Sequence, residues 1–279
     1  MRNQETEIKI SRLTGILKSM GEALVAFSGG VDSTFLLKFG HDLLGDKITA
    51  ITAESDVIPA AEIDSAKEFT AREKVRHVSI WINIFENKSF LANQPDRCYV
   101  CKLEVFRKIK DFAEVNGIHN IAEGSHHDDA GDYRPGARAL AELGIRSPLL
   151  EAGLTKNEIR QTLKYMGLSI WDKPANPCLA TRIPYNVIIR KEMLEKIDEA
   201  EKYLHDLGFR EVRVRYHGSL ARIEVPRHMR NRLLADAVSP AVARKFKELG
   251  FFYTAIDIEG YRMGSMNELI LPEGADGQG

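Results

Sequence analysis

Short apolar segments alternate with amphipathic ones along the first part of the chain. Four apolar runs of strand length lie at 23–27, 47–55, 77–82 and 119–125. Apolar residues recur at helical spacing at 5–20, from 33 onward, and at 60–74, 101–117 and 154–167. Strands that alternate with helices are typical of a parallel sheet that is covered by helices on both faces. We therefore predict an α/β domain over residues 1–187.

The pattern changes near residue 187. The predicted elements from there on are a helix at 186–208, a hairpin at 210–226, helices at 229–238 and 240–250, and a strand at 251–258. The turn of the hairpin is expected at His217-Gly218, because glycine favours tight turns. We predict a small α+β domain over 188–270 that serves substrate binding and oligomerisation. Residues 271–279 have little to bury and are predicted to be disordered.

Valine and arginine alternate over 212–215, so the valines share one face of the predicted hairpin and the arginines the other. A two-residue turn there would place Arg213 opposite Arg222, and Glu211 opposite Glu224. Like charges directly opposite each other are unfavourable. Either this face is solvated and screened by salt, or its arginines await an anion and its glutamates hold a cation.

The composition argues against several classes of protein. The 279 residues carry a formal net charge of −1, so no global basic field favours a nucleic-acid partner. No apolar run approaches the ~20 residues of a membrane-spanning helix, and the first residues lack the pattern of a signal peptide. We expect a cytoplasmic protein without a membrane partner. The three cysteines are an odd number, which disfavours structural disulfides in such a reducing compartment.

The segment "VAFSGGVDSTFLL" joins the first predicted strand to the following helix. Gly29 and Gly30 allow a tight turn and a close approach of the backbone to a ligand. A helix that begins after such a turn presents N–H groups and a positive dipole end, which suit phosphate. The alternative is a glycine turn that only connects a strand to a helix. The segment is not a Walker-type P-loop, because no Gly-Lys-Ser/Thr follows the glycines.

Residues 28–33 instead match S-G-G-x-D-S, and the chain resembles the PP-loop ATP pyrophosphatases at this motif. The resemblance implies an adenine nucleotide alpha hydrolase-like fold, and an enzyme that cleaves ATP between its α- and β-phosphates. The loop amides and the Ser33 hydroxyl would hold pyrophosphate, and Asp32 would help to place Mg²⁺. The expected nucleotide-binding residues are Ser28, Gly29, Gly30, Val31, Asp32, Ser33, Thr34, Ser55, Ser125 and Asp129. Most of these follow strand ends, where ligands of parallel sheets bind.

The cysteines form a second group of candidate residues. Cys98 and Cys101 stand in a C-x-x-C, and Cys178 lies in "ANPCLATRIPY". Such a set can hold a 4Fe-4S cluster that leaves one iron open, or zinc together with His126 or His127. A redox dithiol or persulfide relay and plain core thiols are the other interpretations. We favour the cluster, because the loop of Cys178 is expected to face the nucleotide site.

Further motifs make the resemblance specific to the LarE family, the sulfur transferases that build the nickel-pincer nucleotide cofactor. They are "SGGVDS", "RCYVCK", "DYRPGARA", "LGIRSPL", "GLTKNEIR", "WDKPANPCLATRIPY", "VRVRYHG" and "ARIEV", spread over about residues 10–265. The resemblance implies that MgATP adenylates a carboxylate of pyridinium biscarboxylic acid mononucleotide and that pyrophosphate is released. A sulfur nucleophile then displaces AMP and leaves a thiocarboxylate, and the second carboxylate follows. It also suggests a homo-oligomer.

The sulfur source differs within the family. Members with one cysteine, at the position of Cys178, give up its sulfur, whereas members with three cysteines resemble cluster-dependent tRNA thiolation enzymes. Cys98, Cys101 and Cys178 place this chain with the second group. We therefore expect catalytic turnover with sulfide, or a sulfide donor, and an iron–sulfur cluster. Sacrifice of the Cys178 sulfur is the alternative.

Other roles are implied by the resemblance alone. Lys102 would neutralise phosphate charge and, with Cys178 and Asp32, complete the catalytic set. Arg182 would face the same site. Arg213 and Arg215 would hold the substrate phosphate, and Glu224 would bind a divalent cation. The chain departs from the usual pattern at His126, where relatives more often have asparagine, which leaves the contact at that position undetermined.

Three other functions compete with this one. A tRNA thiolase of the same superfamily could use the same three cysteines, but the near-neutral chain offers no obvious surface for RNA. An amide-forming synthetase would need no cysteine set. A nucleotide sensor would bind ATP without cleaving it, which the complete S-G-G-x-D-S motif argues against.

Overall fold

The computed structural model describes residues 4–131, 135–262 and 264–268 of the chain. The chain divides into two compact units, Met1–Ile84 with Asp96–Asn176, and Phe85–Pro95 with Pro177–Gly279. The domain boundary that we predicted at residue 187 stays a prediction. The predicted disordered segment 271–279 lies outside the described residues.

The first unit contains a sheet of four parallel strands in the order β3-β2-β1-β4. These are β1 (Ala23–Ala26), β2 (Ile48–Glu54), β3 (Arg76–Trp81) and β4 (Ile121–Ala122). The two inner strands are rich in buried apolar residues, as expected for a parallel sheet that is covered on both faces. All four carboxyl ends lie at one edge of the sheet, which is where the predicted nucleotide-binding residues follow the strands.

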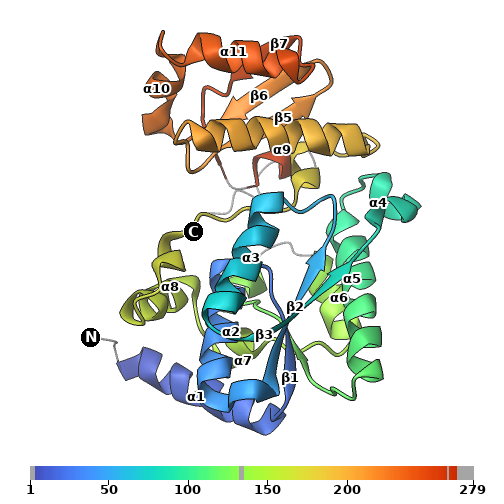
Figure 1. Ribbon diagram of the computed structural model, residues 1–279, viewed down its shortest axis with the longest axis vertical. Helices are drawn as coiled ribbons and strands as arrows, with labels where there is room; N and C mark the ends of the chain where they lie inside the picture. The colour runs from blue at the N-terminus through green and yellow to red at the C-terminus, as the bar shows by residue number, and fades with distance from the viewer. Residues whose placement is uncertain (1–3, 132–134, 263, 269–279) are drawn as a thin grey trace. The chain divides into compact units, whose positions relative to one another are not determined.

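Helices cover both faces of this sheet (Figure 1). The first unit contains α1 (Gln4–Met20), α2 (Val31–Leu44), α3 (Ala60–Arg72), α5 (Arg97–Val115), α6 (Pro135–Glu142), α7 (Pro148–Ala152) and α8 (Lys156–Tyr165). Val25 and Ala50 pack with α1, α2, α3, α7 and α8. Leu24 and Ile51 point to the other face and pack with α5 and α6. This alternation along each strand produces two separate cores from one sheet.

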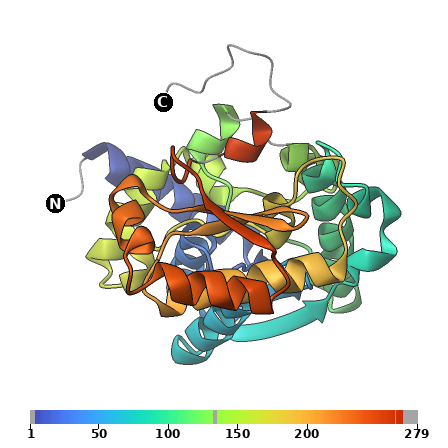
Figure 2. The same ribbon diagram turned by 90° about the horizontal axis from the view of Figure 1, so that it is seen from above.

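The second unit contains a sheet of three strands in the order β5-β6-β7, with β5 antiparallel and β7 parallel to β6. Its elements are α4 (Lys88–Leu91), α9 (Lys191–Asp206), β5 (Arg213–His217), β6 (Leu220–Glu224), α10 (Arg230–Leu234), α11 (Ser239–Glu248) and β7 (Tyr253–Ile256). Helices α9 and α11 lie side by side against one face of this sheet (Figure 2). The apolar face of the hairpin, including Val214 and Ile223, packs there against Leu204 and Phe246.

Short 3-10 helices complete the chain. They are η1 (Gly45–Lys47), η2 (Ile84–Glu86), η3 (His127–Gly131), η4 (Ser169–Asp172), η5 (Leu179–Arg182), η6 (Arg227–Met229) and η7 (Ser265–Asn267). The prediction of a parallel α/β sheet followed by a smaller α+β sheet is confirmed. Among the described helices, none is both long and apolar enough to cross a membrane.

The register of the hairpin differs from our prediction. Arg213 lies opposite Glu224, and Arg215 lies opposite Arg222. The last paired residues are His217 and Leu220, so the two-residue turn is Gly218-Ser219 and not His217-Gly218. Gly218 has a φ of 67°, which the first position of such a turn requires and which glycine adopts without strain. A turn displaced by one residue shifts the pairing by two, which is why the predicted pairs are wrong.

The arginine face of the hairpin is also not solvated. Arg213 is 2% exposed and Arg215 is 5% exposed, while Val212 and Val214 are fully buried on the opposite face. Residues 213–215 of β5 are therefore covered on both faces. The interpretation in which salt screens an exposed charged face is wrong.

Candidate active site

The glycine loop connects the carboxyl end of β1 to the first turn of α2. Gly29 has a φ of 70°, and Gly30 is extended and caps the helix. A Cβ atom at Gly29 would lie 3.2 Å from the Glu62 carbonyl oxygen and 3.3 Å from the Ala66 Cβ of α3. Both the backbone conformation and the close approach of α3 therefore favour glycine here.

Two serines fix the shape of this loop. The Ser33 hydroxyl donates to the Gly30 carbonyl at 3.2 Å and accepts from the Ser28 N–H at 3.3 Å. The Ser28 and Ser33 hydroxyl oxygens are 3.1 Å apart. Thr34 continues the helix, because its N–H donates to the Gly30 carbonyl at 2.9 Å. The first N–H groups of a helix have no acceptor within the helix, so this turn provides donors for an anion.

Asp32 is held by a lysine that the sequence analysis did not single out. The Lys156 ammonium donates to both Asp32 carboxylate oxygens, at 2.7 and 2.6 Å. Lys156 is the first residue of α8, whose N-terminus is fixed by a capping box of Thr155 and Glu158. Its backbone N–H donates to the Asp128 carboxylate at 2.8 Å. The capped helix thus places an ammonium group next to the loop.

Asp129 and His126 lie near the same carboxylate. The Asp129 carboxylate accepts from the His126 N–H at 3.0 Å. The His126 Nε2 atom is 3.4 Å from Asp129 Oδ1 and 4.0 Å from Asp32 Oδ1. The histidine is 7% exposed. His126, one of the two candidate zinc ligands, therefore lies among carboxylates.

The two predicted serines at the strand ends differ in their surroundings. Ser125 donates to the Glu123 carboxylate through its hydroxyl at 2.9 Å and through its N–H at 3.0 Å. The Ser147 hydroxyl donates to Glu123 at 2.5 Å, so this buried glutamate organises the end of β4. Ser55 follows β2 and is buried, and its hydroxyl has no hydrogen-bond partner among the described residues.

A second lysine also contacts the loop. The Lys173 ammonium donates to the Gly29 carbonyl at 3.0 Å and to the Glu62 carboxylate at 2.7 Å. Asn176 donates to the other Glu62 oxygen at 3.2 Å. Lys156 and Lys173 stand in the motifs "GLTKNEIR" and "WDKPAN", which carried the family resemblance without an assigned role. The motifs were the only sequence signal for these contacts.

The C-x-x-C lies in the first two turns of α5. Cys98 is exposed and Cys101 is partly buried. Residues three apart on a helix are neighbours on its surface, so the two thiols share one side of α5. The exposure of Cys98 contradicts the interpretation in which all three cysteines are core thiols. Within the described ranges, no group of three or more His, Cys, Asp or Glu side chains is arranged to hold a metal ion, and the cluster stays a prediction.

Lys102 follows the C-x-x-C and is partly exposed. Its ammonium is 4.0 Å from a Glu123 carboxylate oxygen at the end of β4. The lysine is therefore directed toward the strand ends of the first unit. Its predicted contact with phosphate stays a prediction.

Cys178 lies in the second unit, where it caps the 3-10 helix η5 and is partly buried. Its carbonyl accepts from the Thr181 hydroxyl at 2.8 Å and from the Arg182 guanidinium at 3.1 Å. Arg182 is fully buried, and its guanidinium donates to the two Glu201 oxygens at 3.0 and 2.9 Å. The arginine thus fixes the backbone that carries Cys178. Its predicted role toward the substrate stays a prediction.

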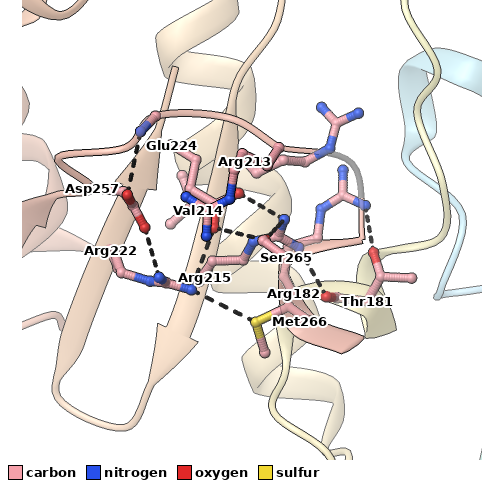
Figure 3. A network of polar contacts seen from close by, with 12 residues as sticks. Thr181, Arg182, Arg213, Val214, Arg215, Arg222, Glu224, Asp257, Ser265 and Met266 are labelled. Atoms are coloured by element: carbon pink, nitrogen blue, oxygen red, sulfur yellow. Dashed lines mark hydrogen bonds and ion pairs between the residues drawn. The ribbon is translucent and has the colours of Figure 1, made fainter. Parts of the chain in front are cut away.

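The arginines of the hairpin belong to a buried polar network (Figure 3). Arg215 donates to the Glu224 carboxylate at 2.6 Å, to the Ser265 hydroxyl at 3.0 Å and to the Thr181 carbonyl at 3.0 Å. Arg222 pairs with Glu224 at 3.3 Å. The Glu224 carboxylate is therefore fully engaged, and a divalent cation there would have to displace an arginine. Its predicted metal role stays a prediction.

Arg213 is buried close to a second arginine, Arg182. Its guanidinium lies 5.1 Å from the centre of the Tyr261 ring and donates to the Val212 carbonyl at 2.6 Å. Burial lowers the pKa of Arg213, and the neighbouring Arg182 charge lowers it further. Both effects oppose the charged form. A bound anion next to this guanidinium would offset them.

Sequence comparisons relate the chain to known proteins, although no family model matches it. It is 38% identical over 264 residues to an uncharacterized protein of Synechocystis sp., covering 95% of this chain and 98% of that protein. It is 35% identical over 263 residues to the pyridinium-3,5-bisthiocarboxylic acid mononucleotide synthase of Lactiplantibacillus plantarum, covering 94% and 95%. It is 23% identical over 200 residues to a glutamine-hydrolyzing GMP synthase component of Archaeoglobus fulgidus, covering 67% and 65%.

The second of these alignments spans nearly the whole of both chains, so it includes the glycine loop and the cysteine-bearing segments alike. The GMP synthase relative agrees with a PP-loop domain built on the parallel sheet. The chain belongs to the LarE family of ATP-dependent sulfurtransferases.

Proposed function

We propose that the protein inserts sulfur into pyridinium biscarboxylic acid mononucleotide after ATP-dependent adenylation of its carboxylates. The observation that carries the proposal is the loop at residues 28–33, where the N–H groups of the first turn of α2, which lack an acceptor within the helix, follow Gly30 and suit an anion. The similarity to a synthase of the bisthiocarboxylic mononucleotide supports the choice of substrate.

In the first step, a substrate carboxylate oxygen attacks the α-phosphorus of ATP, and pyrophosphate leaves with the electrons of the broken bond. The loop amides hold the leaving pyrophosphate, because they point out of the first turn of a helix. Lys156 contacts Asp32 and Lys173 contacts the Gly29 carbonyl, so both place positive charge at this loop. Lys102 would neutralise further phosphate charge from α5.

The residues around Asp32 fit a magnesium ion. Asp32 and Asp129 offer carboxylate oxygens, and Mg²⁺ is usually held by one or two carboxylates together with substrate phosphates. When bound, Mg²⁺ neutralises charge on the phosphate oxygens. Asp32 and Asp129 would hold the ion, and Lys156, which pairs with Asp32, would add positive charge close to the phosphates.

In the second step, a sulfur nucleophile attacks the acyl carbon, and AMP leaves. We propose that Cys98, Cys101 and Cys178 hold a 4Fe-4S cluster, whose open iron supplies a site for sulfide. Thiolates are the usual ligands of such clusters, and Cys98 and Cys101 share one side of α5. The Arg182–Glu201 pair keeps the Cys178 backbone in place. Sulfide, its donor and a homo-oligomeric state are parts of the same proposal.

The substrate also carries a phosphate. We assign it to Arg213 and Arg215, because arginine forks suit phosphate. Arg213 is buried beside Arg182, and a bound anion would offset the repulsion between the two charges.

A pyrophosphate-release assay tests the adenylation step. Purified protein with MgATP should release pyrophosphate when the pyridinium mononucleotide is present and much less when it is absent. Asp32→Asn should lower this rate by at least about 10²-fold, a loss typical of removing one electrostatic contact from a transition state. Release that is equally fast without the substrate, or stimulated by tRNA instead, would contradict the proposal.

Iron analysis tests the sulfur source. Anaerobically purified protein should contain about four irons and four sulfides per chain, and Cys98→Ala should lose both. Absence of iron after anaerobic reconstitution, together with loss of the Cys178 sulfur in one turnover, would favour the sacrificial mechanism.

A further inference from the structure

The motif "RPGARA" has no role in the reaction described so far. Its residues from Pro135 form the helix α6, which lies beside α5 in the first unit (Figure 1). Ala139 and Leu140 are buried, and Leu140 packs in one cluster with Phe106 and Ile109 of α5. This packing brings α6 against the turn of α5 that carries the C-x-x-C and Lys102.

Gly136 is the residue of α6 that lies against the Lys102 side chain. A Cβ atom at this position would lie 2.7 Å from Lys102 Cδ, 3.2 Å from Cε and 3.3 Å from Cγ. Real Cβ atoms essentially never come within 3.0 Å of another heavy atom, so alanine cannot coexist with this lysine rotamer. The atoms in conflict are in the middle of the lysine side chain, so the whole stem would have to move.

Helix propensity and the space around Gly136 are two separate reasons that could place a glycine there. Glycine is less favourable than alanine inside a helix, so helix propensity does not account for Gly136. The matched case is Gly15 in α1, where a Cβ atom would meet nothing within 4 Å. The space at Gly136, in contrast, is filled by the Lys102 stem.

A second contact holds the same turn of α5. The Tyr99 hydroxyl donates to the Glu142 carboxylate at 2.7 Å. The Arg138 guanidinium lies 3.8 Å from the centre of the Tyr99 ring. Tyr99 stands between the two cysteines, so α6 contacts the turn on both sides of Cys101. These exposed contacts are weak individually, but they orient the segment relative to α6.

We infer that Gly136 is a positioning residue for Lys102. Because Gly136 has no side chain, the aliphatic part of Lys102 fits against the backbone of α6, and we call this position the seat of the lysine. The seat directs the ammonium toward Glu123 and the strand ends. The catalytic part of the inference rests on the proposed function, in which Lys102 neutralises phosphate charge.

Chemical labelling tests the seat without reference to activity. The acetylation rate of Lys102 is measured by mass spectrometry in wild type and in Gly136→Ala, with the exposed Lys110 of the same helix as an internal reference. We expect the Lys102 rate to change several-fold while the Lys110 rate stays constant. Gly15→Ala is the control and should leave both rates unchanged. Unchanged labelling of Lys102 in Gly136→Ala would overturn the inference.

A double-mutant cycle tests the catalytic consequence. Gly136→Ala should lower kcat for pyrophosphate release by about 10- to 100-fold, the loss expected from a misplaced group, with little change in KM. In a Lys102→Ala background, which lacks both the ammonium group and the stem atoms that conflict with the new methyl group, the same substitution should cause no further loss. An equal loss in both backgrounds would show that Gly136 only stabilises the fold. Altered labelling with an unchanged kcat would support the positioning of Lys102 by Gly136 and would contradict the proposed role of Lys102 in the reaction.

The cycle remains informative if Gly136→Ala does not fold. Lys102→Ala removes every atom that conflicts with the new methyl group. The double variant Gly136→Ala/Lys102→Ala should then be recovered in folded form. Failure of both variants, with Lys102→Ala alone folding normally, would overturn the inference.

Discussion

The conformation of the glycine loop leads to a quantitative prediction for Gly29→Ala. The new Cβ atom meets two obstacles, the left-handed backbone with a φ of 70° and the close approach of α3. Gly21 is a matched control, because its φ is 69° and a Cβ atom there would meet nothing within 4 Å. Comparison of the two variants separates the backbone cost from the contact cost.

The magnitudes follow from these two obstacles. A left-handed conformation costs a residue with a Cβ roughly 1–2 kcal/mol, and this cost is common to both variants. Crowding in a packed region costs about 1–3 kcal/mol more, and it applies to Gly29 alone, because a carbonyl oxygen 3.2 Å away belongs to the backbone of α3. The reduced entropy of the unfolded chain is the same for both and cancels in the comparison. Gly29→Ala should therefore lose about 1–3 kcal/mol more than Gly21→Ala.

Urea denaturation followed by tryptophan fluorescence measures this difference. The chain has two tryptophans, Trp81 and Trp171, and both lie in the first unit, so the signal reports the unit that contains the loop. Pyrophosphate binding should weaken in Gly29→Ala and remain unchanged in Gly21→Ala. Equal losses of stability in the two variants would refute the reasoning that the contact with α3 fixes the loop.

Three further predictions concern other parts of the chain. Glu201→Gln leaves the fully buried Arg182 without its ionic partner and should destabilise the second unit by about 3–5 kcal/mol, as measured by hydrogen exchange. Burial lowers the pKa of His77 below its ordinary 6.5, so the unfolded chain binds more protons near that pH, and unfolding free energy should fall as pH decreases through 6.5. His77→Gln should flatten this dependence. Thr155→Ala removes the cap of α8 and should cost about 1 kcal/mol in urea denaturation.

Each of these three predictions has a result that would contradict it. A small effect of Glu201→Gln would show that water or another group stabilises the Arg182 charge. An unchanged pH slope in His77→Gln would assign the pH dependence to other groups. A neutral Thr155→Ala would mean that the capping box does not fix the start of α8 or the position of Lys156.

Much of the first unit is predictable from the sequence because its signals are local. The apolar run at 23–27, the two glycines and the following helix predict β1, the loop and α2 nearly to the residue. Gly29 and Gly30 also predict a loop for anions without reference to distant residues. The alternation of strands and helices along the sequence then predicts the parallel sheet.

The contacts that complete the site depend on distant residues. Nothing near Asp32 in the sequence predicts its pairing with Lys156, because the two are brought together only by the packing of α8. The seat of Lys102 on Gly136 depends likewise on how α6 meets α5. The predicted register of the hairpin was wrong because moving the turn by one residue, so that it begins at Gly218, changes every pair along the strands.

The central claim is that ATP cleavage drives sulfur insertion into the pyridinium mononucleotide. The direct measurement incubates anaerobic protein with MgATP, sulfide and this substrate, and quantifies pyrophosphate, AMP and thiocarboxylate by mass spectrometry. We predict one pyrophosphate and one AMP for each carboxylate oxygen replaced by sulfur, over many turnovers per chain. Pyrophosphate release without sulfur in the product, or the absence of both, would contradict the claim.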